Sequence, residues 1–248
     1  MSDRFYTPEL LSAGEFVLDG AEAHHLVTVR RFQNGDQVVL FNGDGHDYPA
    51  EILSADRKQV VLSVRAGIAV ERELPFRMEL AVALPKGNRG DFLIEKLTEL
   101  GVRRLVPLLT ARTIVQPKDN RIDNLQHEVI EASKQSGRNT LMTIESPMRW
   151  PRFVIGSDLP LVRILLHPPR TGTTPCNLKD IPAAAIRGGG VICAVGPEGG
   201  FSEEEVAMAE DLGWIRLSLG PRILRVETSA IAVASWASLL GCCAEGAT

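Results

Sequence analysis

Residues 191–212 read VICAVGPEGGFSEEEVAMAEDL, and this stretch decides the fold. Its first five residues, Val191–Val195, are all apolar, which is typical of a strand buried on both faces of a sheet. Ser202 and Glu205 have the spacing of a capping box, which predicts that a helix begins there. Glycines and a proline fill the connection between the two. A strand, a tight loop and a helix in this order indicate an α/β fold with a parallel sheet.

The same alternation extends through the chain after residue 77. Apolar runs predict further strands at 78–84, 105–109, 161–166 and 215–217. Amphipathic runs predict helices at 91–100, 121–136, 202–212 and 227–240. We therefore expect a parallel-sheet domain over residues 73–248, joined to the preceding part by a linker within residues 65–76.

The preceding part, residues 1–72, has the pattern of a small β domain. Short apolar runs predict strands at 16–18, 37–41, 48–53 and 59–64. Asn42-Gly43-Asp44-Gly45 lies between two of them, and its glycines can adopt the positive φ of a tight hairpin. A helix is predicted over residues 21–32.

Composition excludes several classes of protein. With 44% hydrophobic residues and a net charge of −4, the chain is not predominantly disordered. No apolar run approaches the ~18 residues of a membrane span, and Met1–Arg4 does not begin a signal peptide. We expect a soluble, cytoplasmic protein with no membrane partner. The acidic balance gives no electrostatic footprint for nonspecific nucleic-acid binding, so such a partner would need a local basic face.

Neither metal nor serine chemistry is indicated. The four cysteines, Cys176, Cys193, Cys242 and Cys243, contain no C-x-x-C spacing, which predicts reduced thiols and no metal site. His24-His25 has no further ligand at a metal-binding spacing and indicates hydrogen-bonded histidines. No G-x-S-x-G surrounds a serine, so covalent serine catalysis is not expected.

Three predicted strands end in unusual loops. These loops are His167-Pro168-Pro169, the GPEGG of residues 196–200, and the LGPRILR of residues 219–225. Ligands of open parallel sheets bind outside the carboxyl ends of the strands. If the three strands are neighbours, the loops would form one pocket.

The GPEGG loop favours a ligand without phosphate. It matches neither the dinucleotide nor the P-loop fingerprint. Three glutamates, residues 203–205, follow in the first helical turn, where they would repel a phosphate. A nucleoside that needs close backbone approach fits better, and the alternative is a plain capped turn without a ligand.

Two of these stretches, GPEGGFS at 196–202 and LGPRILRVET at 219–228, closely resemble motifs of the RsmE family. LPKG at 84–87, EKLTELGV at 95–102 and QSGRN at 135–139 support the resemblance. Members of this family are SPOUT-superfamily methyltransferases that act on N3 of a uridine in 16S ribosomal RNA. The sequence departs from the family pattern at Ser229, where a small apolar residue is common, and at Thr140, where the usual proline is missing nearby.

The resemblance implies a fold, partners and a cofactor. The fold is a PUA-like β-barrel over residues 1–72 and a SPOUT domain over residues 73–248, whose chain end passes through a deep trefoil knot. The implied partners are 16S ribosomal RNA or the small ribosomal subunit, and a second copy of the chain in a homodimer. The cofactor is S-adenosylmethionine. Its expected binding residues are Leu166, His167, Gly196, Pro197, Glu198, Gly199, Gly200, Leu217, Leu219, Gly220, Pro221, Ile223 and Leu224.

The chemistry implied by the resemblance gives roles to charged residues. Uracil N3 carries a proton that must leave, and Glu198 is a candidate base or orienter of a base, although it could equally brace loop amides. Arg138 and Arg225 are candidates to stabilise charge on the uracil carbonyl oxygens. Candidates for contact with RNA phosphates, or simply surface charges, are Arg30, Arg31, Lys86 and Arg112.

Three alternative functions stay open. A SPOUT-type enzyme could act on another RNA, such as transfer RNA, and mapping the modified base would decide this. A non-catalytic RNA-binding protein would fail to bind S-adenosylmethionine. A small-molecule methyltransferase is also compatible with the acidic charge balance.

Overall fold

The computed structural model describes residues 3–56, 59–114, 119–168 and 176–242. Two compact units make up the chain: Met1–Glu73 with Ile130–Leu141, and Leu74–Val129 with Met142–Thr248. The first unit thus includes a segment that lies beyond the predicted boundary at residues 72/73. The division into functional domains over 1–72 and 73–248 stays a prediction.

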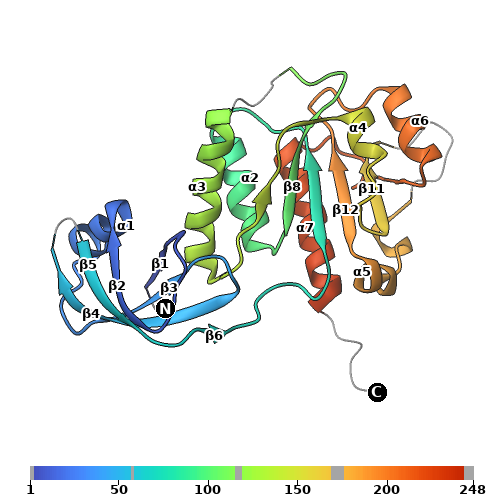
Figure 1. Ribbon diagram of the computed structural model, residues 1–248. Coiled ribbons are helices and arrows are strands. Elements are labelled where there is room, and N and C mark those ends of the chain that lie inside the picture. The colour runs from blue at the N-terminus through green and yellow to red at the C-terminus, as the bar shows by residue number, and fades with distance from the viewer. Residues whose placement is uncertain (1–2, 57–58, 115–118, 169–175, 243–248) are drawn as a thin grey trace. The chain divides into compact units, whose positions relative to one another are not determined.

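The first unit is built on a six-stranded sheet with the order β1-β3-β4-β5-β2, in which β6 pairs with β4 (Figure 1). Its strands are β1 (Arg4–Tyr6), β2 (Gly14–Asp19), β3 (Gln37–Phe41), β4 (His46–Ala55), β5 (Gln59–Val64) and β6 (Ile68–Ala69). The predicted hairpin joins β3 to β4, and Gly43 and Gly45 adopt φ values of 95° and 90° there. Alternate side chains of β3 and β5, including Leu40 and Leu62, point into the core of this unit.

The helix predicted over residues 21–32 is wrong in its second half. An α-helix, α1 (Gly20–His24), passes into a π-helix, η1 (His25–Val29). The amide of Arg30 donates to the carbonyl of His25, five residues back, and Arg31 then adopts a left-handed φ of 59°. Three β-branched residues in a row, at 27–29, lower helix propensity at this point. The wider turn keeps Leu26 fully buried in the core.

A buried carboxylate, that of Asp47, organises the polar interior of the first unit. Arg4 donates two hydrogen bonds of 2.9 Å to it, and Arg72 donates one of 3.0 Å. Burial raises the pKa of Asp47, but the hydrogen bonds from the two guanidinium groups outweigh burial, and its pKa lies below the usual value. Asn139 adds a fourth donor from the segment 130–141, at 3.3 Å.

The second unit holds a seven-stranded sheet in which every pairing is parallel. The strand order is β10-β8-β7-β12-β11-β13, and β9 pairs with β8. The strands are β7 (Met78–Val82), β8 (Arg104–Leu109), β9 (Thr143–Ile144), β10 (Met148–Arg149), β11 (Val162–Leu166), β12 (Val191–Val195) and β13 (Ile215–Leu217). This sheet confirms the predicted α/β class.

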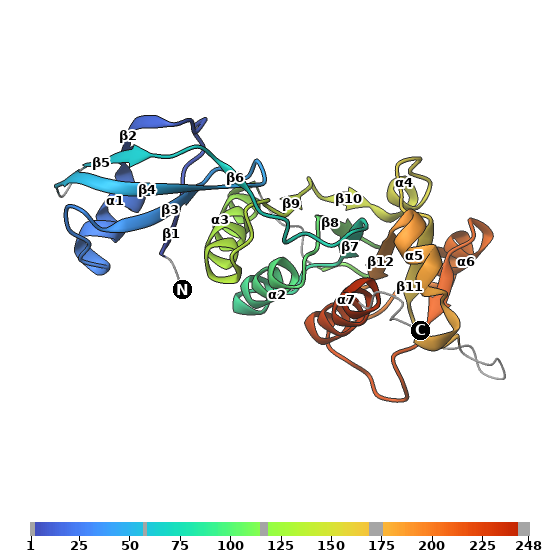
Figure 2. The same cartoon turned by 90° about the horizontal axis from the view of Figure 1, so that it is seen from below.

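Helices cover both faces of this sheet (Figure 2). They are α2 (Asn88–Glu99), α4 (Trp150–Val154), α5 (Ala183–Gly189), α6 (Glu203–Asp211) and α7 (Val226–Cys242), and a 3₁₀ turn η2 (Leu178–Asp180) precedes α5. Helix α3 (Asp119–Ser136) is divided between the two units. Helices α2 and α7 pack together, and α7 lies against β7 and β12. On the other face, Trp150 of α4 and Val206 of α6 share a core with Ile192 of β12. The short elements β9, β10, α4 and α5 were not predicted from the sequence.

The chain changes direction between β7 and β12, which are neighbours in the sheet. After β7 the chain passes through α2 to β8, whereas after β12 it passes through α6 to β13 on the opposite side. The two connections therefore diverge at the carboxyl ends of these strands, which is where open parallel sheets form a ligand crevice. The trefoil knot stays a prediction. Pro169, the last residue of the predicted loop at 167–169, lies outside the described residues. Within the described residues, no helix is long and apolar enough to cross a membrane.

The Asp47 cluster gives a prediction about stability. Replacing Asp47 with Asn leaves the buried guanidinium of Arg4 and the partly exposed guanidinium of Arg72 without their counter-charge, which should lower the free energy of unfolding by about 3–5 kcal/mol. Because the pKa of Asp47 is lower in the folded state, the contribution of its charge should also fade in the wild type as pH drops below about 4. Urea unfolding of Asp47→Asn at pH 7 is the measurement. Glu15→Gln, at an exposed carboxylate of β2, is the matched control, and equal midpoints for the two variants would contradict the prediction.

Candidate active site

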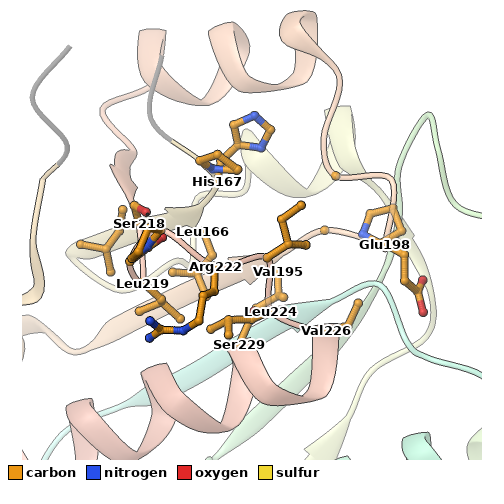
Figure 3. A pocket seen from close by; sticks show the side chains of 18 of the residues that line it. Leu166, His167, Val195, Glu198, Ser218, Leu219, Arg222, Leu224, Val226 and Ser229 are labelled. Carbon is orange, nitrogen blue, oxygen red and sulfur yellow. Dashed lines mark hydrogen bonds between the residues drawn. The ribbon is translucent and has the colours of Figure 1, made fainter. Parts of the chain in front are cut away.

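A pocket of about 620 Å³ opens at the carboxyl ends of β11, β12 and β13 (Figure 3). Because these strands are parallel neighbours, the loops that follow them meet at one edge of the sheet. The pocket is lined by Leu166, His167, Pro168, Asn177, Val195, Gly196, Pro197, Glu198, Gly200, Leu217, Ser218, Leu219, Gly220, Pro221, Arg222, Ile223, Leu224, Val226 and Ser229.

This lining brings together all the predicted cofactor residues except Gly199. Gly199 is exposed, and its carbonyl accepts a hydrogen bond of 2.6 Å from the guanidinium of Arg112. Several lining residues were not among the expected cofactor-binding residues, although Pro168 and Arg222 belong to loops that were expected to form the pocket. They are Pro168, Asn177, Val195, Ser218, Arg222, Val226 and Ser229. Arg222 and Val226 belong to the 219–228 motif, which is a usable signal. Nothing in the sequence near Asn177 indicates its place in the pocket.

The start of α6 is anchored by the predicted capping box. The Ser202 hydroxyl accepts a hydrogen bond from the amide of Glu205, and the Glu205 carboxylate accepts one from the amide of Ser202. The second oxygen of Glu205 accepts a 2.7 Å hydrogen bond from the amide of Ala111, in the loop after β8. Glu205 is buried, so its carboxylate is fully used in binding backbone amides of two loops.

His167 gives the pocket a neutral polar group. It is half-buried at the end of β11, and its amide donates to the carbonyl of Leu217 at 3.1 Å. Burial lowers the pKa of His167, and the positive charge of Arg216 lowers it further. The imidazole is therefore uncharged at neutral pH. Apolar side chains dominate the wall around it, including those of Val195 and Leu224 in Figure 3.

Glu198, the candidate base, lies on the rim of the pocket. Its carboxylate points away from the side chains of His167 and Leu224 in Figure 3. Its Oε1 atom lies 3.2 Å from Nη2 of Arg89, in the first turn of α2. Sequence reasoning did not single out Arg89, because the contact depends on β7 and β12 being neighbours in the sheet.

The other two catalytic candidates do not line the pocket. Arg138 belongs to the first unit, where it is 3% exposed and its Nε donates to the Glu73 carboxylate at 2.8 Å. Arg225 is exposed in the segment before α7. Their roles in the reaction stay predictions.

The four candidate RNA-binding residues are exposed and divide between the two units. Arg30, which forms an ion pair with Asp3, and Arg31 belong to the first unit. Lys86 and Arg112 belong to the second unit, and Arg112 also braces the loop at Gly199. Contact between these side chains and RNA stays a prediction.

The described part of the chain contains no cluster of three or more side chains suited to a metal ion. Cys193 is a buried free thiol, and burial raises its pKa, so it stays protonated. Cys176 is also a free thiol and is only partly buried. Cys243 and the side chain of Cys242 lie outside the described residues.

Comparison with protein families finds two matches that together extend over most of the chain. A family described as an RNA methyltransferase domain matches residues 72–238. A second family, described as an RNA methyltransferase PUA domain, matches residues 18–65 and confirms the predicted PUA-like N-terminal part.

Individual relatives agree with these matches. The ribosomal RNA small subunit methyltransferase E of Synechocystis is 32% identical over 226 residues, which cover 90% of this chain and 72% of the relative. A crystal structure of that enzyme from Neisseria gonorrhoeae, bound to S-adenosyl methionine, has a TM-score of 0.86 at 29% identity and covers 97% of this chain and 98% of its own. A protein of Legionella pneumophila, solved in complex with the same cofactor, has a TM-score of 0.85 at 32% identity, with 97% of each chain covered. With this sequence similarity along nearly its whole length and a methyltransferase-domain match over residues 72–238, the chain belongs to the RsmE family of RNA methyltransferases.

Proposed function

We propose that this protein transfers a methyl group from S-adenosylmethionine to N3 of a uridine in 16S ribosomal RNA. The observation that carries the proposal is that the loops after β11, β12 and β13 together line one pocket. Two relatives with similar folds were solved with S-adenosylmethionine, and several relatives are named as small-subunit ribosomal RNA methyltransferases.

The residues of the pocket fit this cofactor. A volume of about 620 Å³ is in the usual range for sites that enclose a ligand of this size. Leucines at 166, 217, 219 and 224 offer apolar walls for an adenine ring, and the glycines at 196, 200 and 220 leave backbone amides and carbonyls accessible. The three glutamates in the first turn of α6 disfavour phosphate and tolerate a cationic ligand. When bound, S-adenosylmethionine supplies a methyl group that its sulfonium has already activated.

The chain's own residues then orient the acceptor, exclude water and manage one proton. The apolar side chains around Val195 and Leu224 keep water from the ligand. Glu198, on the rim, is the carboxylate that we assign to accept the proton of uracil N3. We retain Arg138 and Arg225 as proposed stabilisers of charge on the uracil, and the basic residues at 30, 31, 86 and 112 as proposed phosphate contacts.

We extend the proposal to assembly and location on the strength of the family resemblance. The protein is proposed to be a homodimer that acts in the cytoplasm on the small ribosomal subunit, with its chain end threaded through a trefoil knot. Light scattering on the purified protein tests the dimer, because a monomeric mass at micromolar concentration would contradict it.

The function is tested with radiolabelled S-adenosylmethionine and three substrates: small ribosomal subunits, naked 16S RNA and transfer RNA. We expect label in 16S RNA or in the subunit, and N3-methyluridine in the nucleoside digest by mass spectrometry. Label in transfer RNA alone, or on another base, would support the alternative SPOUT-type activity. Loss of all cofactor binding in calorimetry would favour a non-catalytic RNA-binding protein.

Blocking the pocket should abolish cofactor binding. Ser229 lines the pocket from the first turns of α7, and Ser229→Phe places a large ring in it. We expect the affinity for S-adenosylmethionine to fall at least about a hundredfold in calorimetry, since an overfilled pocket costs more than about 2.7 kcal/mol of binding. Ser157→Phe adds the same side chain on an exposed loop of this unit and is the control. A folded Ser229→Phe protein with normal affinity would contradict the assignment of the pocket.

Cofactor affinity should weaken in acid because of His167. Burial holds the pKa of His167 below the ordinary histidine value, so the imidazole is neutral at pH 7 and gains a proton only as the pH falls further. A protonated imidazole repels the cationic sulfonium, and binding near pH 5 should therefore be weaker than at pH 7. His167→Asn should lose part of this pH dependence, whereas His24→Asn, at an exposed site of the first unit, should keep all of it. Calorimetric titrations at the two pH values decide between these outcomes.

Glu198→Gln should separate chemistry from binding. Glutamine keeps the size and hydrogen-bonding ability of the side chain but cannot take up the N3 proton. We expect the single-turnover rate to fall about 10²–10⁴-fold at saturating RNA and cofactor, with cofactor affinity nearly unchanged. Glu15→Gln, at an exposed carboxylate of β2 that does not line the pocket, is the control. A near-normal rate for Glu198→Gln would reduce Glu198 to a structural carboxylate of the loop.

A further inference from the structure

Arg89 connects two carboxylates at the point where the chain direction changes in the sheet. It lies in the first turn of α2, after β7. Its Nη2 atom is 3.2 Å from Oε1 of Glu198, in the loop after β12, and its Nη1 atom is 3.7 Å from Oε2 of Glu227, in the first turn of α7. One guanidinium group thus joins three segments that are far apart in the sequence.

The contact with Glu227 provides an anchor. The Glu227 side chain is 9% exposed, and within the described residues its buried Oε2 atom accepts no hydrogen bond. A buried carboxylate oxygen without a hydrogen-bond donor needs a nearby positive charge. The Arg89 guanidinium supplies that charge, and the attraction draws the arginine toward α7.

The contact with Glu198 is of a different kind. The Glu198 side chain is 59% exposed, and exposed ion pairs add little stability. An unpaired glutamate in a glycine-rich loop would sample several rotamers, only some of which present its carboxylate to a substrate. A planar guanidinium that is anchored from behind restricts this freedom, since its donors have a fixed geometry.

We propose that Arg89 is a positioning residue for the methyl-transfer step: held by Glu227, it sets the direction of the Glu198 carboxylate at the rim of the pocket. The proposal rests on the proposed function, in which Glu198 is the base. Arg89 itself is not a lining residue of the pocket, so it acts through Glu198 and not on the cofactor.

Two measurements on Arg89→Ala, Arg89→Lys and wild type test the proposal. The first is amide hydrogen exchange of residues 198–200 in the protein without ligands, which reports on the loop alone. We expect faster exchange in Arg89→Ala. Arg89→Lys should have an intermediate exchange rate, because lysine keeps the positive charge but lacks the planar guanidinium with its several donors. Lys96→Ala removes a cation of the same helix, paired with Glu95 and Glu99, and should leave exchange in this loop unchanged.

The second measurement is single-turnover methylation of the small subunit. Arg89→Ala should lose about a hundredfold in rate, the loss typical of a reacting group misplaced by about 1 Å, while its cofactor affinity stays within about twofold. In a Glu198→Gln background the same substitution should cost nothing further, because the residue it positions is already disabled. A purely structural role would lower the rate equally in both backgrounds.

The outcomes separate this inference from the proposed function. Unchanged loop exchange in Arg89→Ala, or rate losses that multiply in the double variant, would overturn the positioning role. Faster exchange together with a wild-type enzyme that methylates no RNA would show that Arg89 holds Glu198 but that the proposed function is wrong. Faster loop exchange with a normal methylation rate in Arg89→Ala would show that Arg89 holds the loop, but it would overturn the role of Arg89 in methyl transfer.

Discussion

The pocket depends on the hydrogen bonds that the Glu205 carboxylate accepts from two backbone amides. One oxygen accepts the amide of Ser202 at 2.9 Å and the other accepts the amide of Ala111 at 2.7 Å, so the loops after β12 and β8 share one anchor. The backbone carbonyl of Glu205 accepts a third hydrogen bond, from the indole of Trp150. Because this carboxylate is buried, water competes little for its bonds. The glycine-rich loop can therefore adopt open backbone conformations at its centre while its end stays in place.

The amino ends and the carboxyl ends of the parallel strands carry different side chains. Glu79, which is 1% exposed near the start of β7, accepts hydrogen bonds from Arg77 and Arg104. This charge cluster lies at the amino ends of β7 and β8, whereas the pocket lies at the carboxyl ends of β11, β12 and β13. A buried carboxylate between two guanidinium groups restricts strand register, because a shift by one residue would leave it uncompensated. The charge cluster at the amino ends of the strands thus favours a single strand register. The loops at the carboxyl ends are presented to a ligand.

Local sequence signals predicted the parts of the site that depend on local structure. The strand Val191–Val195, the capping box at Ser202 and the lining loops could be predicted because apolar runs, caps and glycines act over a few residues. The pairing of the Arg138 guanidinium with Glu73 could not be predicted, because only the tertiary fold brings the two side chains together. The Arg89–Glu198 contact was missed for the same reason, since it requires the spatial order of β7 and β12. The π-helix after His24 shows a related limit, because burial of Leu26 outweighs the regular helical period.

The first unit is formed by two segments that are far apart in the sequence, and this affects the order in which the chain folds during synthesis. Asn139 donates to the carbonyls of Gly45 and Val70, at 3.0 and 3.2 Å, and its own carbonyl accepts the amide of Gly45. These bonds close the unit with a segment that the ribosome adds only after β7, α2 and β8. During vectorial synthesis the N-terminal strands must therefore wait, with the carboxylate of Asp47 incompletely paired, until residues 130–141 emerge. Helix α3 contributes to both units, so the nascent chain completes the first unit only while it is already building the second.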